Sequence, residues 1–284
     1  PALGAAGATP QEALRDGDKG SAGGAFARIA RGLIVAEIAV TVVLLVGAGT
    51  FVRALDRMAA MNIGAATAPE QVLTANLDLL AEQFPQPADQ VAFFERVVAR
   101  LRADPGVIDA SASNTVPGAR LGSHEYVGAL GAAQPDGGYL KAQMGVVDAH
   151  FAGTYGLRLR GGRLLDERDR ADTEPVAVVS EQLAGQLWPG RDPLGQRLLL
   201  NPQRDSAQTL TVVGVIDALQ LDGPLEPALT SLLVPMRQFP VDSATLSVHT
   251  RGAPLAFAPT LAAIVGAESP DSAPYRLRTQ GQAI

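Results

Sequence analysis

The longest apolar run in the chain covers residues 32–52 and contains one charged residue, Glu37. At the helical rise of about 1.5 Å per residue, a run of this length spans about 30 Å, the hydrocarbon thickness of a bilayer. The run is apolar on every face and contains no proline, whereas a helix on the surface of a soluble core keeps a polar side. The pattern therefore predicts a transmembrane helix.

Two other interpretations of this run stay open. A core helix buried on all sides would show the same pattern, although it would need an unusually large protein around it. A secretory signal sequence could be cleaved beside Gly47, Ala48 and Gly49, although the run is long for such a signal and follows an extended N-terminal stretch.

Basic residues flank the run unevenly. Those before it are Arg15, Lys19, Arg28 and Arg31, and those after it are Arg53 and Arg57. Cytoplasmic flanks of membrane spans carry the excess of Lys and Arg. The N-terminus is therefore predicted to be cytoplasmic and the residues after about 53 extracytoplasmic.

The segments next to the run differ in composition. Residues 1–27 are rich in alanine and glycine and cannot bury enough apolar surface to offset the entropy of ordering, so they are predicted to be a flexible cytoplasmic linker. Helical spacing of apolar residues continues to about Met61, after which Asn62, Gly64 and Pro69 interrupt it. Residues 28–61 are therefore predicted to form the transmembrane helix and a short stalk.

Beyond the stalk, the pattern indicates two β-α-β units, residues 66–118 and 244–284, on either side of a β-rich insertion, residues 119–243. In the first unit, Asp89 is expected to cap the helix. The expected helices are 90–103, 181–187 and 255–265, and the expected strands are 71–79, 107–116, 139–147, 176–180, 209–216, 244–250 and 275–279.

These elements predict an α+β fold. Two β-α-β units of this kind pack as a ferredoxin-like layer, and the β-rich subdomain is then inserted between the two halves of that layer. One transmembrane helix precedes this extracytoplasmic domain.

Composition and charge exclude several kinds of function. The formal net charge of −6 argues against a nucleic-acid partner, since phosphate backbones attract basic surfaces. The chain has no cysteine, so disulfides, thiolate metal sites and cysteine nucleophiles are excluded. The Gly-Lys-Ser/Thr end of a nucleotide-binding loop is also missing from the sequence, so any ATPase must be another polypeptide.

Two polar clusters have residue types that could carry chemistry. Ser123, His124 and Glu125 are the types of a catalytic triad, but consecutive residues of an extended chain point to alternate faces. The second cluster contains Asp166, Glu167, Asp169 and Asp172. The arginines interleaved with these residues would compete with calcium for the carboxylates. We therefore expect no catalytic residue, no cofactor site, no metal site and no enzymatic activity.

Within the span, three residues are candidates for packing against another membrane helix. Gly47 and Gly49 are small enough to let helix backbones approach closely. Glu37 is a carboxylate within an apolar segment, and such a group usually faces a partner helix or a polar cavity. Because it lies about one turn from the cytoplasmic end of the span, reaching the interface or becoming protonated is the alternative.

Several sequence motifs resemble those of the FtsX-like, MacB-type ABC transporter permeases. Residues 31–39 (RGLIVAEIA) and 44–49 (LLVGAG) resemble the helix that opens a half of such a permease. Motifs resembling the MacB-like periplasmic core domain of that family are 105–107 (PGV), 161–163 (GGR), 175–181 (PVAVVSE), 188–195 (WPGRDPLG) and 212–217 (VVGVID). The resemblance covers about residues 28–284.

The resemblance implies a ferredoxin-like "porter" part, residues 66–118 and 244–284, and an inserted "sabre" part, residues 119–243. It also implies a bacterial inner-membrane permease that couples ATP hydrolysis by a separate P-loop ATPase to extracytoplasmic movement, for export or extraction of an unknown cargo. The implied partners are that ATPase, other permease spans or a second permease half, and membrane lipid.

The chain departs from the family in showing one span where such permeases have several. Further spans are therefore expected beyond Ile284 or are absent, and residues 1–27 resemble the linker that joins the halves of duplicated members. This favours the second half of a duplicated permease. A single-span extracytoplasmic receptor or scaffold is the alternative, and a secreted hydrolase released by signal cleavage is a third possibility.

Overall fold

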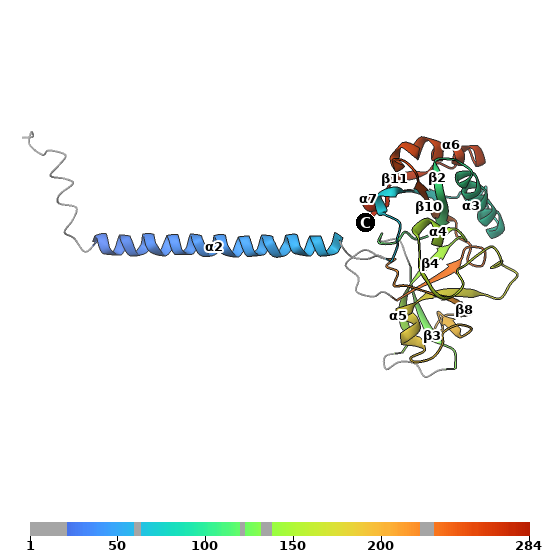
Figure 1. The fold of residues 1–284 in the computed structure, drawn as a ribbon, viewed down its shortest axis with the longest axis horizontal. Coiled ribbons are helices and arrows are strands. Elements are labelled where there is room, and N and C mark those ends of the chain that lie inside the picture. Colours follow the sequence, from blue (N-terminus) through green and yellow to red (C-terminus); the bar gives the residue numbers. More distant parts are fainter. Residues whose placement is uncertain (1–21, 60–63, 120–122, 132–137, 222–229) are drawn as a thin grey trace, which may run out of the picture. The chain divides into compact units, whose positions relative to one another are not determined.

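In the computed structural model, two compact units follow one another along the chain, Pro1–Met61 and Asn62–Ile284. The structure describes residues 22–59, 64–119, 123–131, 138–221 and 230–284. The N-terminal part of the predicted linker, residues 1–21, and the predicted end of the stalk, residues 60–61, lie outside the described residues. Each unit is described below by itself (Figure 1).

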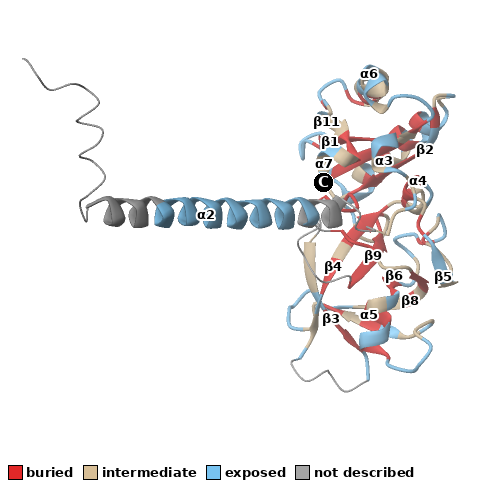
Figure 2. Cartoon of the chain, turned by 60° about the vertical axis from the view of Figure 1, so that its left-hand side comes forward, coloured by how far each residue is buried: buried red, intermediate tan, exposed pale blue. Residues whose placement is uncertain are grey.

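The first unit contains one long helix, α2 (Ala22–Ala59). It begins within the predicted linker, because the alanine-rich residues from Ala22 onward favour a helix once the apolar run has nucleated it. Its segment Arg31–Arg53 is long and apolar enough to cross a membrane and is the one such segment among the described residues. Every side chain of residues 31–53 is exposed (Figure 2), so the structure does not support the interpretation as a buried core helix.

The second unit contains both predicted β-α-β units. The first comprises β1 (Val72–Asp78), α3 (Pro87–Arg102) and β2 (Val107–Ser113), and the second comprises β10 (Ser243–Thr250), α6 (Ala258–Glu268) and β11 (Tyr275–Thr279). Their strands are antiparallel and lie in the order β11-β1-β10-β2. We call these six elements the terminal lobe, which lies at one end of the domain (Figure 1).

The helix α3 packs its apolar side onto this sheet, as its sequence pattern predicts. Its buried side chains are Val91, Phe93, Phe94, Val97, Val98 and Leu101. The expected cap was wrong: Gln86 is the N-cap residue and Pro87 occupies the first turn, because proline's fixed φ suits that position. Asp89 lies inside the first turn, where its charge favours the helix dipole.

The inserted residues form a closed ring of six strands. In ring order these are β4 (Leu140–Val147), β3 (Ser123–Ala129), β7 (Arg197–Leu200), β8 (Gln208–Ile216), β6 (Val176–Ser180) and β9 (Ser231–Pro235). The parallel pairing of β4 with β9 closes the ring. We call this ring and its connections the ring lobe.

Two shorter elements complete the ring lobe. The strand β5 (Leu159–Gly162) pairs with β8 outside the ring, and α5 (Glu181–Leu187) follows β6 directly. The hydroxyl of Ser180 caps α5 by accepting a hydrogen bond from the Leu183 N–H. The predicted bounds of α5 and β6 are therefore confirmed.

The two lobes meet where β2 pairs with β4 through one residue pair, Ser113 and Val147. Ser113 also pairs with Thr245 of β10, so the points where the chain leaves and re-enters the terminal lobe are neighbours. The short helix α4 (Phe151–Tyr155) packs beside this joint. Its Tyr155 hydroxyl lies 2.7 Å from the Ser247 hydroxyl of β10, which ties α4 to the terminal lobe.

Candidate functional site

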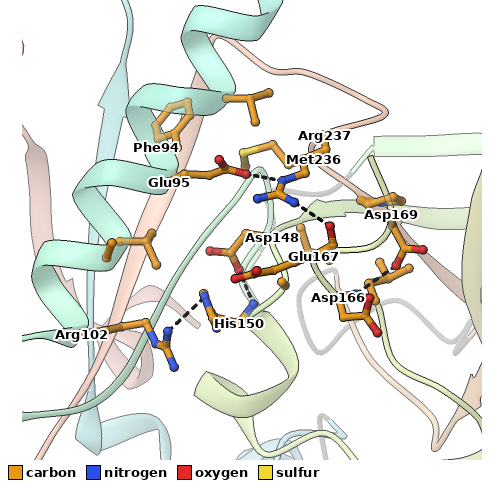
Figure 3. A pocket seen from close by; sticks show the side chains of 17 residues that line it. Phe94, Glu95, Arg102, Asp148, His150, Asp166, Glu167, Asp169, Met236 and Arg237 are labelled. Atoms are coloured by element: carbon orange, nitrogen blue, oxygen red, sulfur yellow. Dashed lines mark hydrogen bonds and ion pairs between the residues drawn. The ribbon is translucent and has the colours of Figure 1, made fainter. Parts of the chain in front are cut away.

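A cleft of about 270 Å³ lies between the two lobes (Figure 3). The helix α3 forms one wall, the end of β4 and the residues before α4 form the floor, and two ring-lobe segments form the opposite wall. The charged or ionisable side chains that line it are Glu95, Arg102, Asp148, His150, Asp166, Glu167, Asp169 and Arg237. The site is therefore built from segments that are far apart in the sequence.

An ion pair spans the cleft from one lobe to the other. Arg237, just after β9, pairs through Nε with the Glu95 carboxylate of α3. Its Nη1 donates to the Glu167 carbonyl oxygen at 2.7 Å. The bonded Glu95 raises the pKa of Arg237, so the arginine stays charged. Since both side chains are partly exposed, such a pair is worth about 0–1 kcal/mol and can open readily.

Asp148 forms the floor of the cleft and connects the lobes at their joint. Its Oδ2 accepts the Ala112 N–H of β2 at 2.9 Å, and its Oδ1 accepts the His150 N–H at 3.0 Å. Burial raises the pKa of Asp148 to about 7, although the backbone N–H groups act in the opposite direction. The carboxylate is therefore firmly positioned but costly to ionise.

His150 lies beside Asp148 and contacts α3. Arg102 Nη1 lies 3.1 Å from His150 Nε2, and Arg102 Nε donates to Asp109 Oδ1 at 2.8 Å. Burial, followed by the charge of Arg102, lowers the pKa of His150. The ring is therefore neutral near pH 7, and Nε2 accepts the hydrogen bond from Arg102.

The acidic loop is neutralised by its own arginines, as its sequence pattern predicts. Arg163 forms two bonds with the buried Asp169 carboxylate, at 2.8 and 2.5 Å. Arg168 binds Asp166, and Arg170 binds Asp172. In the part of the chain that the structure describes, no group of His, Asp or Glu residues is arranged to hold a metal ion.

The remaining residues considered in the sequence analysis lie outside the cleft. Ser123, His124 and Glu125 follow one another along β3, and Arg204 pairs with Glu125 at 3.7 Å. On α2, the Thr41 hydroxyl donates to the Glu37 carbonyl at 2.8 Å. Gly47 and Gly49 both face open space.

Sequence reasoning did not identify Glu95, Asp148, His150 or Arg237 as members of one site. These residues come from four separate segments, and none belongs to a motif that marks a site. The weak signal was Glu95, a charged residue beside the apolar face of α3.

Comparison with known proteins agrees with this architecture. The sequence profile of the MacB-like periplasmic core domain matches residues 30–273. The fold is similar to the crystal structure of the periplasmic region of MacB from Actinobacillus actinomycetemcomitans, with a TM-score of 0.50, 14% identity, and coverage of 78% of this chain and 94% of that one.

A second similar structure is the extracellular domain of the noncanonic ABC-type transporter YknZ from Gram-positive bacteria. Its TM-score is 0.46 at 15% identity, with coverage of 72% of this chain and 100% of that one. The comparison with curated proteins found no match. On the strength of the profile match, the chain belongs to the MacB-like periplasmic core domain family of MacB/FtsX-type ABC transporter permeases.

Proposed function

We propose that this chain couples ATP hydrolysis by a separate ATPase to movement of an extracytoplasmic domain, for export or extraction of a cargo. The observation that carries the proposal is one chain joining an apolar helix of membrane-spanning length to a domain of the MacB-like family. The receptor or scaffold alternative explains neither the family nor the two-lobed domain.

The moving parts in this proposal are the two lobes. The strand order β11-β1-β10-β2 with α3 and α6 supports a ferredoxin-like layer, which would be the porter part in this proposal. The ring lobe corresponds to the sabre part. The lobes are joined by the β2–β4 residue pair, the partly exposed Arg237–Glu95 ion pair and the hydrogen bonds of Asp148 and Tyr155, so a change of angle between them would rearrange this joint.

The proposal includes a membrane topology, which cysteine labelling tests because the chain contains no cysteine. Ser206 is exposed in the ring lobe, and Ser21 precedes the span. In intact spheroplasts, a membrane-impermeant maleimide is expected to label Ser206→Cys but not Ser21→Cys. After lysis, the maleimide should label both cysteines. The reverse pattern would overturn the orientation.

The packing side of α2 is also part of the proposal. Glu37, Val40, Leu44 and Gly47 follow one another at spacings of three and four residues and share a face. Gly49 is two residues from Gly47, about 200° around the helix, on the opposite side. The two glycines therefore do not share one interface, and we assign the packing side to Glu37 and Gly47.

Replacing Gly47 by leucine is expected to weaken association with the other permease spans by about 1–3 kcal/mol, because the added side chain overfills a close helix contact. Gly49→Leu is the matched control and should associate like the original chain. The measurement is co-purification with the other permease spans in mild detergent. Equal loss in both variants, or no loss in either, would contradict this assignment.

A further inference from the structure

Some of the charged side chains that line the inter-lobe cleft are paired with an opposite charge in the described part of the chain, and others are not. Arg102 is bonded to Asp109 and His150, and Arg237 is bonded to Glu95. Asp166 and Asp169 have their own arginines. Among the described side chains, none with a positive charge bonds to the carboxylates of Asp148 and Glu167. The cleft therefore has an excess of negative charge at its floor and on one wall.

The rest of the lining is apolar. Val91, Phe94 and Val98 come from α3, and Leu165 and Met236 come from the ring lobe. The volume of about 270 Å³ lies just below the usual range of ligand pockets, about 300–1,000 Å³. A ligand that fits this space is small, and it combines a hydrocarbon body with a positive charge.

We propose that the inter-lobe cleft binds a small organic ammonium ion, whose charged nitrogen meets Asp148 and whose hydrocarbon part lies along α3. The Asp148 carboxylate accepts the backbone N–H groups of Ala112, His150 and Phe151, which leaves about one of its four lone-pair sites for an ammonium donor. The carboxylate is held in place before the ligand arrives, which reduces the entropy lost on binding. Glu167 adds a second negative charge at the more exposed side.

The arginines of the cleft do not favour an anionic ligand instead. The guanidinium groups of Arg102 and Arg237 are occupied by carboxylates from the protein itself. An anion would also face Asp148 and Glu167. A cation fits the charges that remain, and its charge offsets the cost of keeping a carboxylate in this half-buried position.

The test uses the full chain in nanodiscs at about pH 8, where a primary amine is protonated. Phenethylammonium is the probe, 2-phenylethanol is its neutral analogue, and 3-phenylpropanoate is its anionic analogue. Ligand-observed NMR, with empty nanodiscs subtracted, is expected to show saturable binding of the ammonium and about tenfold weaker binding of the other two.

Three variants locate the site. Asp148→Asn is expected to weaken ammonium binding about tenfold, and Ala99→Leu, which fills the cleft from α3 without changing a charge, should abolish it. Asp205→Asn, at an exposed carboxylate outside the cleft, is the control. Fluorescence of the buried Trp188, the single tryptophan, verifies that each variant is folded.

Equal binding of the neutral analogue, or binding that survives Ala99→Leu, would overturn the proposal, and so would the absence of saturable binding. If Asp148→Asn does not fold, Ala99→Leu alone decides the outcome. All measurements use the chain without an ATPase or other spans. Their failure therefore leaves the proposed permease function untouched.

Discussion

Replacement of Gly214 by alanine is expected to destabilise the extracytoplasmic domain by about 3 kcal/mol or more. A Cβ atom at this position of β8 would overlap the carbonyl oxygen of Arg163 and lie 3.0 Å from the carbonyl carbon. Both are backbone atoms held in place, since the Arg163 N–H donates to the Val213 carbonyl at 2.9 Å. The neighbouring chain must therefore separate from β8 to make room.

Thermal unfolding of the full chain in detergent measures this effect. Trp188 is the single tryptophan and is 4% exposed within the domain, so its fluorescence reports on the domain and not on α2. Gly185→Ala is the matched control, because nothing lies within 4 Å of a Cβ atom there and Gly185 is inside the helix α5. It should stabilise by about 0.5–1 kcal/mol. An unchanged Tm in Gly214→Ala would mean that β8 does not approach residue 163 so closely.

The second large effect is a dependence of stability on pH that comes from Asp148. Its pKa is about 7 in the folded protein against an ordinary value of 3.8, so the folded state binds the proton more tightly than the unfolded state. Below about pH 4 the Asp148 carboxyl is protonated in both the folded and the unfolded state, so it does not lower the stability of the domain. As the pH rises from about 4 to about 7, the folded state loses stability, up to about 4 kcal/mol above that window.

Asp148→Asn removes this ionisation. We therefore expect the Tm of the original chain to fall relative to that of the variant as the pH is raised from about 4 to about 8. Asp205→Asn should follow the original chain, since this exposed carboxylate lies away from the joint. Parallel curves for the original chain and Asp148→Asn across the window would contradict the raised pKa.

The sequence was sufficient to predict the elements that have local signals. Residues 181–187 form a helix because Ser180 supplies an N-cap hydroxyl directly after a strand of β-branched residues. The alternating residues of β1 and the apolar face of α3 likewise depend on neighbours within the same segment. The bounds of these elements were predicted to within a few residues.

Elements without such signals were missed. β9 is short and buried on both sides, and it pairs with β4, which precedes it by about 90 residues in the chain. No local pattern encodes that pairing, so the closed ring could not be predicted. The same reason explains the missed cleft: Glu95, Asp148 and Arg237 are brought together by tertiary packing alone.

Ser113 and Thr245 are neighbours in adjacent strands of the terminal lobe. Everything between them leaves and returns at one spot on the terminal lobe. A different module with closely spaced ends could be grafted there, or the present one lengthened, without disturbing the strand order of the sheet beneath it. The architecture thus allows the ring lobe to diversify or be exchanged while the terminal lobe stays constant.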